Sequence, residues 1–271
     1  MTTLTNLETV AWEWHWHPDP GVIEGLVALT VLYCLALGPA RTYLAPGAVF
    51  SRWRAAGFHL GTLLVFWAVA SPLDELSERY LFSAHMFQHV ILVFPVPVLW
   101  LLGTPPWVVK PFLDMDWSAP VLRFFSQPIV ALLAFNLVFY VWHIPGLYEW
   151  ALRDSKIHFL EHATFMGAAM LQWWPLIPPL EVRPRLHYGF QLLYLLAGAI
   201  LQFPLFFLLA FMNKSFYPTY VSAPRIVQLN PMMDQQLGAI IMKLAAMAVM
   251  FISVTVVFGR WYYAETPRAQ R

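Results

Sequence analysis

Cysteine and charge are both scarce in this chain of 271 residues. Cys34 is the only cysteine and lies within an apolar run, which excludes an internal disulfide and any Cys-x-x-Cys metal or redox motif. Charged residues make up 11% of the sequence and the formal net charge is +1, so no face can carry the basic excess that nucleic acids require. We therefore expect no nucleic-acid partner, and any metal site must use histidine, methionine or carboxylate ligands.

The N-terminus lacks the features of a cleavable signal peptide. Its first twenty residues, MTTLTNLETVAWEWHWHPDP, contain neither a basic n-region nor an apolar h-region. Hydrophobic residues are nevertheless abundant, at 59% of the whole chain, which is well above the proportion in a soluble domain. We expect a membrane protein whose insertion is directed by its own spanning segments.

Seven apolar segments approach the length of about 20 residues that a helix needs to cross the bilayer core. They cover approximately residues 21–38, 56–71, 84–102, 124–142, 159–177, 189–211 and 236–258. The third contains Pro95 and Pro97, which predict a kink or a break in its hydrogen bonding. No repeat or low-complexity linker divides the chain, so the sequence predicts an all-α, polytopic membrane protein, a single bundle of seven transmembrane helices over residues 1–271.

Lysine and arginine are divided unequally between the two sides of this predicted bundle. One side collects ten of them, Arg41, Arg52, Arg54, Lys110, Arg123, Arg183, Arg185, Arg260, Arg268 and Arg271. The other side collects five, Arg79, Arg153, Lys156, Lys214 and Arg225, together with most of the acids. The positive-inside rule then predicts an N-terminus outside the membrane and a C-terminus in the cytoplasm.

Five of the nine histidines fall at one predicted depth, at the outer ends of three segments. They are His85 and His89 in the third segment, His143 in the fourth, and His158 and His162 in the fifth. Each HxxxH pair places two imidazoles on one helix face, one turn apart. A single interfacial histidine is more often an anchor or a hydrogen-bond partner, but this convergence of five favours a metal site.

Other side chains could adjust such a site. Met86 offers a thioether beside His85, which suits copper, and Asp234 offers a carboxylate at the outer start of the last segment. Glu161 and Glu24 could bind directly or orient an imidazole through a hydrogen bond.

Three further polar residues have ambiguous roles. His15 and His17 alternate with tryptophan in WEWHWHPDP, which suits an interfacial aromatic belt as well as an access site for metal. Lys243, inside the last segment, is expected to snorkel or to pair with an acid such as Glu24 or Asp234.

The order of the motifs resembles the bacterial, Bacillus-type CtaG family of assembly factors for the caa-type cytochrome c oxidase. HMFQH is followed by WHIPGLY, HFLEH, QWWP and DQQLGAIIMK, and the resemblance runs over about residues 20–260. It implies a multi-pass protein of the bacterial plasma (inner) membrane that is needed to make active oxidase, with a suspected part in copper delivery. The matching positions are His85, Met86, His89, His143, His158, Glu161, His162, Asp234 and Gln235. GAIIMK departs from the Gly-Gly pair and tryptophan common in the family, so Lys243 has no precedent there.

We therefore expect a copper-binding assembly factor, not an enzyme. Copper from periplasmic chaperones would be held by the five histidines, with Met86 or Asp234 adjusting the site and Gln235 supporting it, and passed to the oxidase's catalytic subunit. A haem-binding redox protein is an alternative. A haem with two axial histidines would, however, take only one histidine from each HxxxH pair and leave the other without a role. A metal-dependent membrane enzyme, with zinc or a di-metal centre and Glu161 as general base, is another, although no HExxH motif occurs. A structural oxidase subunit without metal is the remaining reading.

Overall fold

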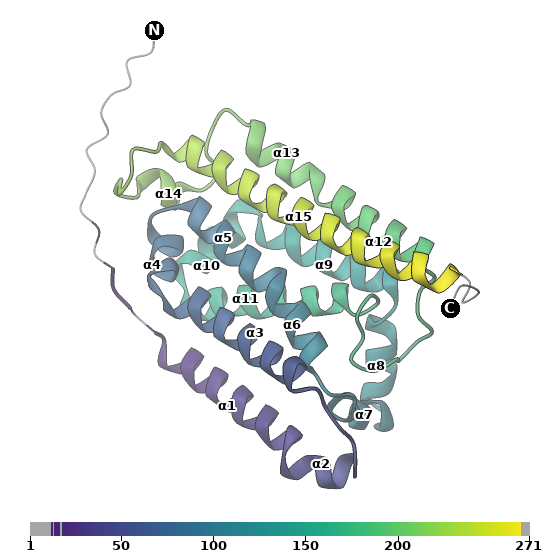
Figure 1. Cartoon of the computed structure of the whole chain (residues 1–271). Coiled ribbons are helices and arrows are strands. Elements are labelled where there is room, and N and C mark those ends of the chain that lie inside the picture. Colours follow the sequence, from purple (N-terminus) through teal and green to yellow (C-terminus); the bar gives the residue numbers. More distant parts are fainter. Residues whose placement is uncertain (1–11, 13, 17, 267–271) are drawn as a thin grey trace.

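The computed structural model describes residues 12, 14–16 and 18–266, and these residues form helices without a β-strand (Figure 1). The helices are α1 (Pro20–Leu37), α2 (Pro39–Leu44), α3 (Arg52–Ala70), α4 (Pro72–Arg79), α5 (Phe82–Val93), α6 (Pro95–Gly103), α7 (Pro106–Asp114), α8 (Ser118–Phe125), α9 (Pro128–Trp142), α10 (Pro145–Arg153), α11 (Ser155–Trp173), α12 (Tyr188–Leu201), α13 (Phe203–Phe211), α14 (Pro218–Ser222) and α15 (Pro231–Glu265).

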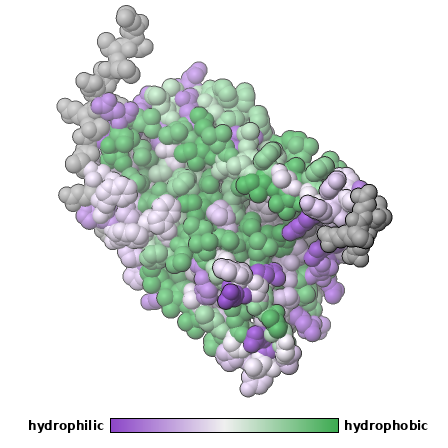
Figure 2. Space-filling model, in the orientation of Figure 1, coloured by the Kyte–Doolittle hydropathy of each residue, from purple (hydrophilic) through white to green (hydrophobic). Residues whose placement is uncertain are grey.

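Five helical segments of the described chain are long and apolar enough to cross a membrane. They are α1, α3, α5 with α6, α12 with α13, and α15. A sixth is present if α8 and α9, which meet at an angle of 81°, form one broken span. The chain is therefore a multi-pass membrane protein, and Figure 2 shows hydrophobic residues over much of the visible helical face.

The predicted segments and the helices differ most in the fourth and fifth. The fourth was expected to begin at residue 124, but the chain turns at Ser126 and Gln127 and α9 begins at Pro128. The fifth corresponds to α11, a helix of 19 residues that carries several polar side chains and is not among the candidate spans. A seven-span bundle and its orientation therefore remain predictions.

The break expected from the prolines of the third segment is present. Helix α5 ends at Val93 and α6 begins at Pro95, although the two together still form one span of 22 residues. Pro95 has no backbone N–H and its ring opposes continuation of the preceding helix, which explains the position of the break. His85 and His89 therefore lie on α5, which is a separate helix from α6.

Helix α5 packs against both α11 and α15 at one end of the bundle. Gly238 of α15 lies so near α5 that a Cβ atom there would sit 2.5 Å from the Phe82 ring. The absence of a side chain lets the two backbones approach, as is common between membrane helices. Phe82 also stacks on Tyr217, with ring centroids 5.0 Å apart, and joins a buried cluster with Met86 and Tyr148.

Three short helices, α4, α10 and α14, cover this end of the bundle (Figure 1). Glu149 of α10 accepts hydrogen bonds from the backbone N–H and the hydroxyl of Thr219 in α14, at 3.1 and 2.8 Å. Tyr220 of α14 donates to the carbonyl oxygen of Ser77 in α4, at 2.6 Å. These bonds tie the three helices together over the first turns of α5, α11 and α15.

Candidate metal centre

Helix α5 presents two histidines from its first turns, and its N-terminus is fixed by a partner far away in the sequence. Both carboxylate oxygens of Asp234, in α15, accept backbone N–H groups of α5, from Phe82 at 2.7 Å and from Ser83 at 3.1 Å. Such a carboxylate satisfies amides that the helix itself leaves unpaired and opposes the positive end of the helix dipole. His85 and His89 therefore project from a firmly held helix end, and both are buried.

Helix α11 presents three polar residues on one face. His158, Glu161 and His162 are spaced by three and four residues, which places them side by side along the helix. The helix begins at a local cap, in which the Asp154 side chain accepts the backbone N–H groups of Lys156 and Ile157. All three side chains are buried, with 6%, 1% and 6% of their surfaces exposed.

The two helices bring these side chains together, and we call His85, His89, His158, Glu161 and His162 the imidazole cluster. The Glu161 Oε1 atom lies 3.8 Å from Nε2 of His85 and 3.7 Å from Nε2 of His89. Two groups of three residues each bring potential ligand atoms within 4.8 Å of one another. One group is His85, His158 and His162, and the other is His85, His89 and Glu161. Two atoms bound to one ion at about 2.1 Å can be at most about 4.2 Å apart, so small shifts complete either set.

Hydrogen bonding within the cluster is unusually incomplete. Both ring nitrogens of His85 and of His89, both oxygens of Glu161, and Nε2 of His158 and of His162 are buried without a hydrogen-bond partner. Burial of a polar group without a partner costs free energy, and native proteins rarely leave such groups close together. A cation bound among them would satisfy lone pairs that the protein leaves unused, so the residues fit a metal ion.

Two imidazoles are held in a defined orientation by bonds to their other nitrogen. Nδ1 of His158 donates to Oε1 of Glu78 in α4, at 2.6 Å, and Nδ1 of His143 donates to the Phe139 carbonyl, at 2.7 Å. A proton on Nδ1 leaves the Nε2 lone pair available, as is usual for histidine ligands of metals. Because Nε2 of each ring has no other partner, both rings are oriented for ligation.

Asp74 and Glu78, two acids of α4, have altered pKa values because this helix is packed against the cluster. Burial, reinforced by the nearby Glu78, raises the pKa of Asp74 to about 7. Burial would also raise the pKa of Glu78, but the hydrogen bond and the charge of His158 lower it overall. Glu78 therefore faces His158 as a carboxylate, whereas Asp74 titrates near neutral pH.

His143 lies beside the imidazole cluster without belonging to either close group. It follows the last residue of α9, and its backbone carbonyl accepts a hydrogen bond from Tyr217, at 3.1 Å. Its ring centroid is 6.2 Å from that of Phe165, and it shares the wall of a cavity with His89. This fifth histidine is therefore adjacent to the cluster, across Phe165.

The remaining candidate residues lie elsewhere. Met86 packs into the hydrophobic cluster of Phe82 and Tyr148, and Asp234 has both oxygens engaged by amides of α5. Gln235 accepts from Phe216 N–H at 2.8 Å and donates to the Leu209 carbonyl at 3.1 Å, which fixes the chain after α13.

Glu24 and His15 are not part of the cluster either. Glu24 is exposed on α1, and His15 is exposed in the segment before it. His17 lies outside the described residues.

Two residues near the cluster were not anticipated from the sequence. Glu78 is one of several acids in this part of the sequence, yet it bonds His158 directly. Tyr148 lies with its ring centroid 5.0 Å from that of His85 and contacts the cluster from α10. Tyr148 could have been found from the sequence, because it ends the motif WHIPGLY, which also contains His143. Glu78 could not, because nothing in SPLDELSER distinguishes it from the neighbouring acids.

Comparison with known proteins gives one kind of match. The sequence model of the cytochrome c oxidase caa3 assembly factor family (Caa3_CtaG) matches residues 31–264, which is most of the chain and includes the whole imidazole cluster. No curated protein and no solved structure matches the chain.

Proposed function

The chain belongs to the family of cytochrome c oxidase caa3 assembly factors, and from this premise we propose that it binds copper at the imidazole cluster and delivers it to the oxidase's catalytic subunit. The observation that carries the proposal is the set of buried imidazole and carboxylate atoms without hydrogen bonds, contributed by α5 and α11. The family is one of assembly factors and not of named enzymes, so the metal is treated as cargo.

Copper is the cargo that the donor set and the family favour together. Imidazole nitrogen binds copper well, and copper stands highest among the divalent first-row metals in affinity for such sites. The cluster has four imidazoles and one carboxylate, with His143 beside them, which is more than one ion needs. A surplus of ligands allows them to be exchanged one at a time, as transfer to another protein requires.

The extracytoplasmic side is the proposed location of the cluster. The side that is richer in lysine and arginine has eight such residues in the described part of the chain. They lie on α2, α3, α7 and α8, in the 174–187 connection and near the end of α15, and are Arg41, Arg52, Arg54, Lys110, Arg123, Arg183, Arg185 and Arg260. In Figure 1, α2, α7, α8 and the C-terminal end of helix α15 lie at the end of the bundle away from α4 and α14. The positive-inside rule assigns that end to the cytoplasm and the cluster to the outside, where periplasmic copper chaperones could supply the ion.

Haem fits the cluster less well than a single ion does. The ring centroids of His85 and His89 are 4.3 Å apart, and those of His158 and His162 are 4.2 Å apart. Rings of the two helices also approach each other, at 5.2 Å between His89 and His162. This packing leaves no slot for a macrocycle between two axial imidazoles.

Metal analysis of the purified protein tests the proposal. We expect copper in the wild-type protein after growth with copper, and its loss in the double variant His85→Ala, His89→Ala. A matched control is the double variant His59→Ala, His187→Ala, which removes two histidines outside the cluster and should keep the copper. Copper that remains in the cluster variant would rule out this site, and zinc in place of copper would refute the choice of cargo.

Cells provide the second readout. The cluster variant should accumulate in the membrane and still fail to support active caa3 oxidase, whereas the control should support it. Full oxidase activity with the cluster variant would contradict delivery through these histidines.

A further inference from the structure

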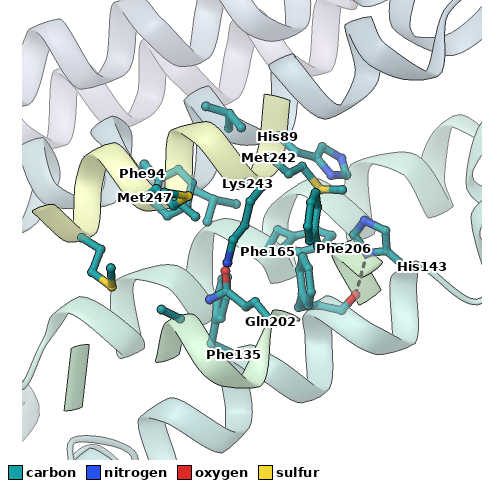
Figure 3. Close-up of a pocket in the computed structure, with 16 residues that line it drawn as sticks. His89, Phe94, Phe135, His143, Phe165, Gln202, Phe206, Met242, Lys243 and Met247 are labelled. Carbon is teal, nitrogen blue, oxygen red and sulfur yellow. Dashed lines mark hydrogen bonds between the residues drawn. The ribbon is translucent and has the colours of Figure 1, made fainter. Parts of the chain in front are cut away.

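A cavity of about 70 Å³ lies between the imidazole cluster and α15 (Figure 3). This volume holds several water molecules, since one needs about 10–15 Å³ on the same measure. Its polar lining consists of His89, His143, Gln202 and Lys243, and the rest of the wall is apolar, chiefly phenylalanine and methionine side chains. In Figure 3, Lys243 and Gln202 point toward each other across the cavity.

Lys243 has no carboxylate partner among the described residues. Its ammonium nitrogen instead lies 4.4 Å from the ring centroid of Phe203 and 5.7 Å from that of Phe206. The acids expected to pair with it are engaged or distant, because Asp234 caps α5 and Glu24 is exposed on α1. A cation inside a spanning helix is costly and ordinarily marks a ligand or an acidic partner.

The charge of Lys243 decides which class of ligand the cavity suits. Met242, Met247 and Met250 also line the wall, and thioethers beside imidazoles would suit a soft metal ion. An ammonium in a medium of low dielectric repels such an ion strongly, and none of the described residues that line the cavity is a carboxylate that could offset it. The cavity therefore favours an oxygen acceptor over a second cation.

The cavity reaches the surface of the spanning helices. Met247, one of its lining residues, is 48% exposed on α15, and Ala199 of α12 lines the same cavity. Both helices are among the candidate membrane spans, so this surface faces the bilayer. A molecule that enters here comes from the lipid phase and must be largely apolar.

We propose that this cavity binds an apolar molecule of the bilayer whose head carries an oxygen acceptor, held by the ammonium of Lys243 and the amide of Gln202. The phenylalanines pack against its apolar part, and its tail leaves the cavity past Met247 into lipid. An ionised fatty-acid carboxylate and a quinone carbonyl share this chemistry. The proposal concerns a second site and holds whether or not the imidazole cluster carries copper.

Direct binding of two probes to the full-length protein in detergent micelles tests this site. One probe is a spin-labelled stearic acid, followed by the immobilised fraction of its spectrum, and the other is a short-chain quinone, followed by equilibrium dialysis. We expect saturable binding of at least one probe to the wild-type protein. Stearate alone identifies a carboxylate ligand, and quinone alone identifies a carbonyl ligand.

Variants separate the cavity from the general lipid-facing surface. Lys243→Met keeps the stem and removes the charge, so affinity should fall about tenfold or more, as expected for loss of a hydrogen bond to a charged group. Lys243→Arg should retain binding, and Ala246→Phe should abolish it by filling the cavity. The control Ala248→Phe adds the same bulk to an exposed position of α15 outside the cavity and should leave binding unchanged.

Two results would overturn the proposal. One is the absence of saturable binding of either probe to the wild-type protein, and the other is wild-type affinity in both Lys243→Met and Ala246→Phe. Copper content measured on the same preparations keeps the two proposals apart, because Lys243→Met should not change it.

Discussion

Two groups of buried polar side chains lie at the same end of the molecule and differ in one respect. Around Asp234, Gln235 and Glu149, the carboxylate and amide groups bond to backbone or side-chain partners. In the imidazole cluster, most of the nitrogen and carboxylate atoms have no hydrogen-bond partner among the described residues. We call the first group the bonded network, and its partners show that this end of the fold can satisfy buried polar atoms.

The contrast is sharpest within α5 itself. The Gln88 amide donates to the Ala68 carbonyl and to Asp74, and its oxygen accepts from Ser77, at 2.8, 2.6 and 3.0 Å. His89, the next residue, has neither ring nitrogen bonded. Neighbouring residues of a helix point in directions about 100° apart, so Gln88 bonds to the rest of the fold whereas His89 keeps unused lone pairs. The difference supports our proposal that the bonded network is structural and that the cluster binds a metal ion.

The substitution Glu161→Gln tests the cluster with the largest expected effect. It removes the one carboxylate of the cluster and keeps its shape, and a unit charge about 4 Å away contributes about 4 kcal/mol at an effective dielectric of 20. Copper affinity should therefore fall roughly a thousandfold in competition with a chelator. Thermal unfolding of the metal-free protein should be unchanged or shifted upward, because a buried carboxylate without donors is removed.

A matched control for this change is Glu181→Gln, at an exposed position near the opposite end. It should alter neither copper affinity nor stability. A metal-free Glu161→Gln protein that unfolds far more easily than wild type would show that Glu161 belongs to the fold and would erase the contrast between the two groups.

The substitution Asp234→Ala tests the bonded network. It leaves two buried amides of α5 without an acceptor, and each such loss costs about 1–3 kcal/mol, so the free energy of unfolding should fall by about 3 kcal/mol. Thermal unfolding in detergent measures the loss, with Asp114→Ala at an exposed position of α7 as the control. The fraction that remains folded should still bind copper, and selective loss of copper at unchanged stability would make Asp234 a ligand after all.

The convergence of the histidines could be predicted from the sequence because helical spacing fixes which side chains share a face. His85 and His89 are four residues apart, as are His158 and His162, and both pairs do meet. Met86 was grouped with them because it is adjacent in sequence, but one residue along a helix turns the side chain by about 100°, into the hydrophobic cluster. Adjacency in sequence and adjacency in space differ in a helix.

Contacts over long separations could not be predicted in this way. Asp234 meets Phe82 across 152 positions, and no local pattern distinguishes a carboxylate that caps a distant helix from one that binds an ion. The 81° bend between α8 and α9 is hidden for a similar reason, since hydropathy reports composition along the chain and not its direction. In α11, the polar residues that indicated a metal site from the sequence, His158, Glu161 and His162, also make this helix less hydrophobic.

The substitution Glu78→Gln sharpens the comparison at the boundary of the two groups. Glu78 is not itself a proposed ligand, but its carboxylate accepts the Nδ1–H of His158. Loss of a hydrogen-bond partner of a ligating histidine typically lowers metal affinity by about 10–100-fold. Because glutamine retains an acceptor oxygen without the charge, we expect a loss of about tenfold, at the lower end of that range. Copper competition measures it, and Glu75→Gln, on the same helix and paired with Arg79 at 3.9 Å, is the control. Equal losses in both variants would mean that overall acidity of α4, and not the bond to His158, supports the site.

The smallest expected effect comes from Tyr220→Phe, in α14 next to Thr219, which bonds to Glu149 of the bonded network. The Tyr220 hydroxyl donates to the Ser77 carbonyl at 2.6 Å and lies 3.0 Å from the Tyr148 hydroxyl, so its removal leaves both groups short of a partner. The free energy of unfolding should fall by about 1 kcal/mol, measured by thermal unfolding. The control is Tyr263→Phe, at a residue that is 81% exposed. Copper affinity should not change, even though Tyr148 packs against His85, because that contact is made by the ring and not by the hydroxyl. A fall in copper affinity as large as that of Glu78→Gln would show that the bonds around Tyr148 set the position of His85, and the two groups would then act as one.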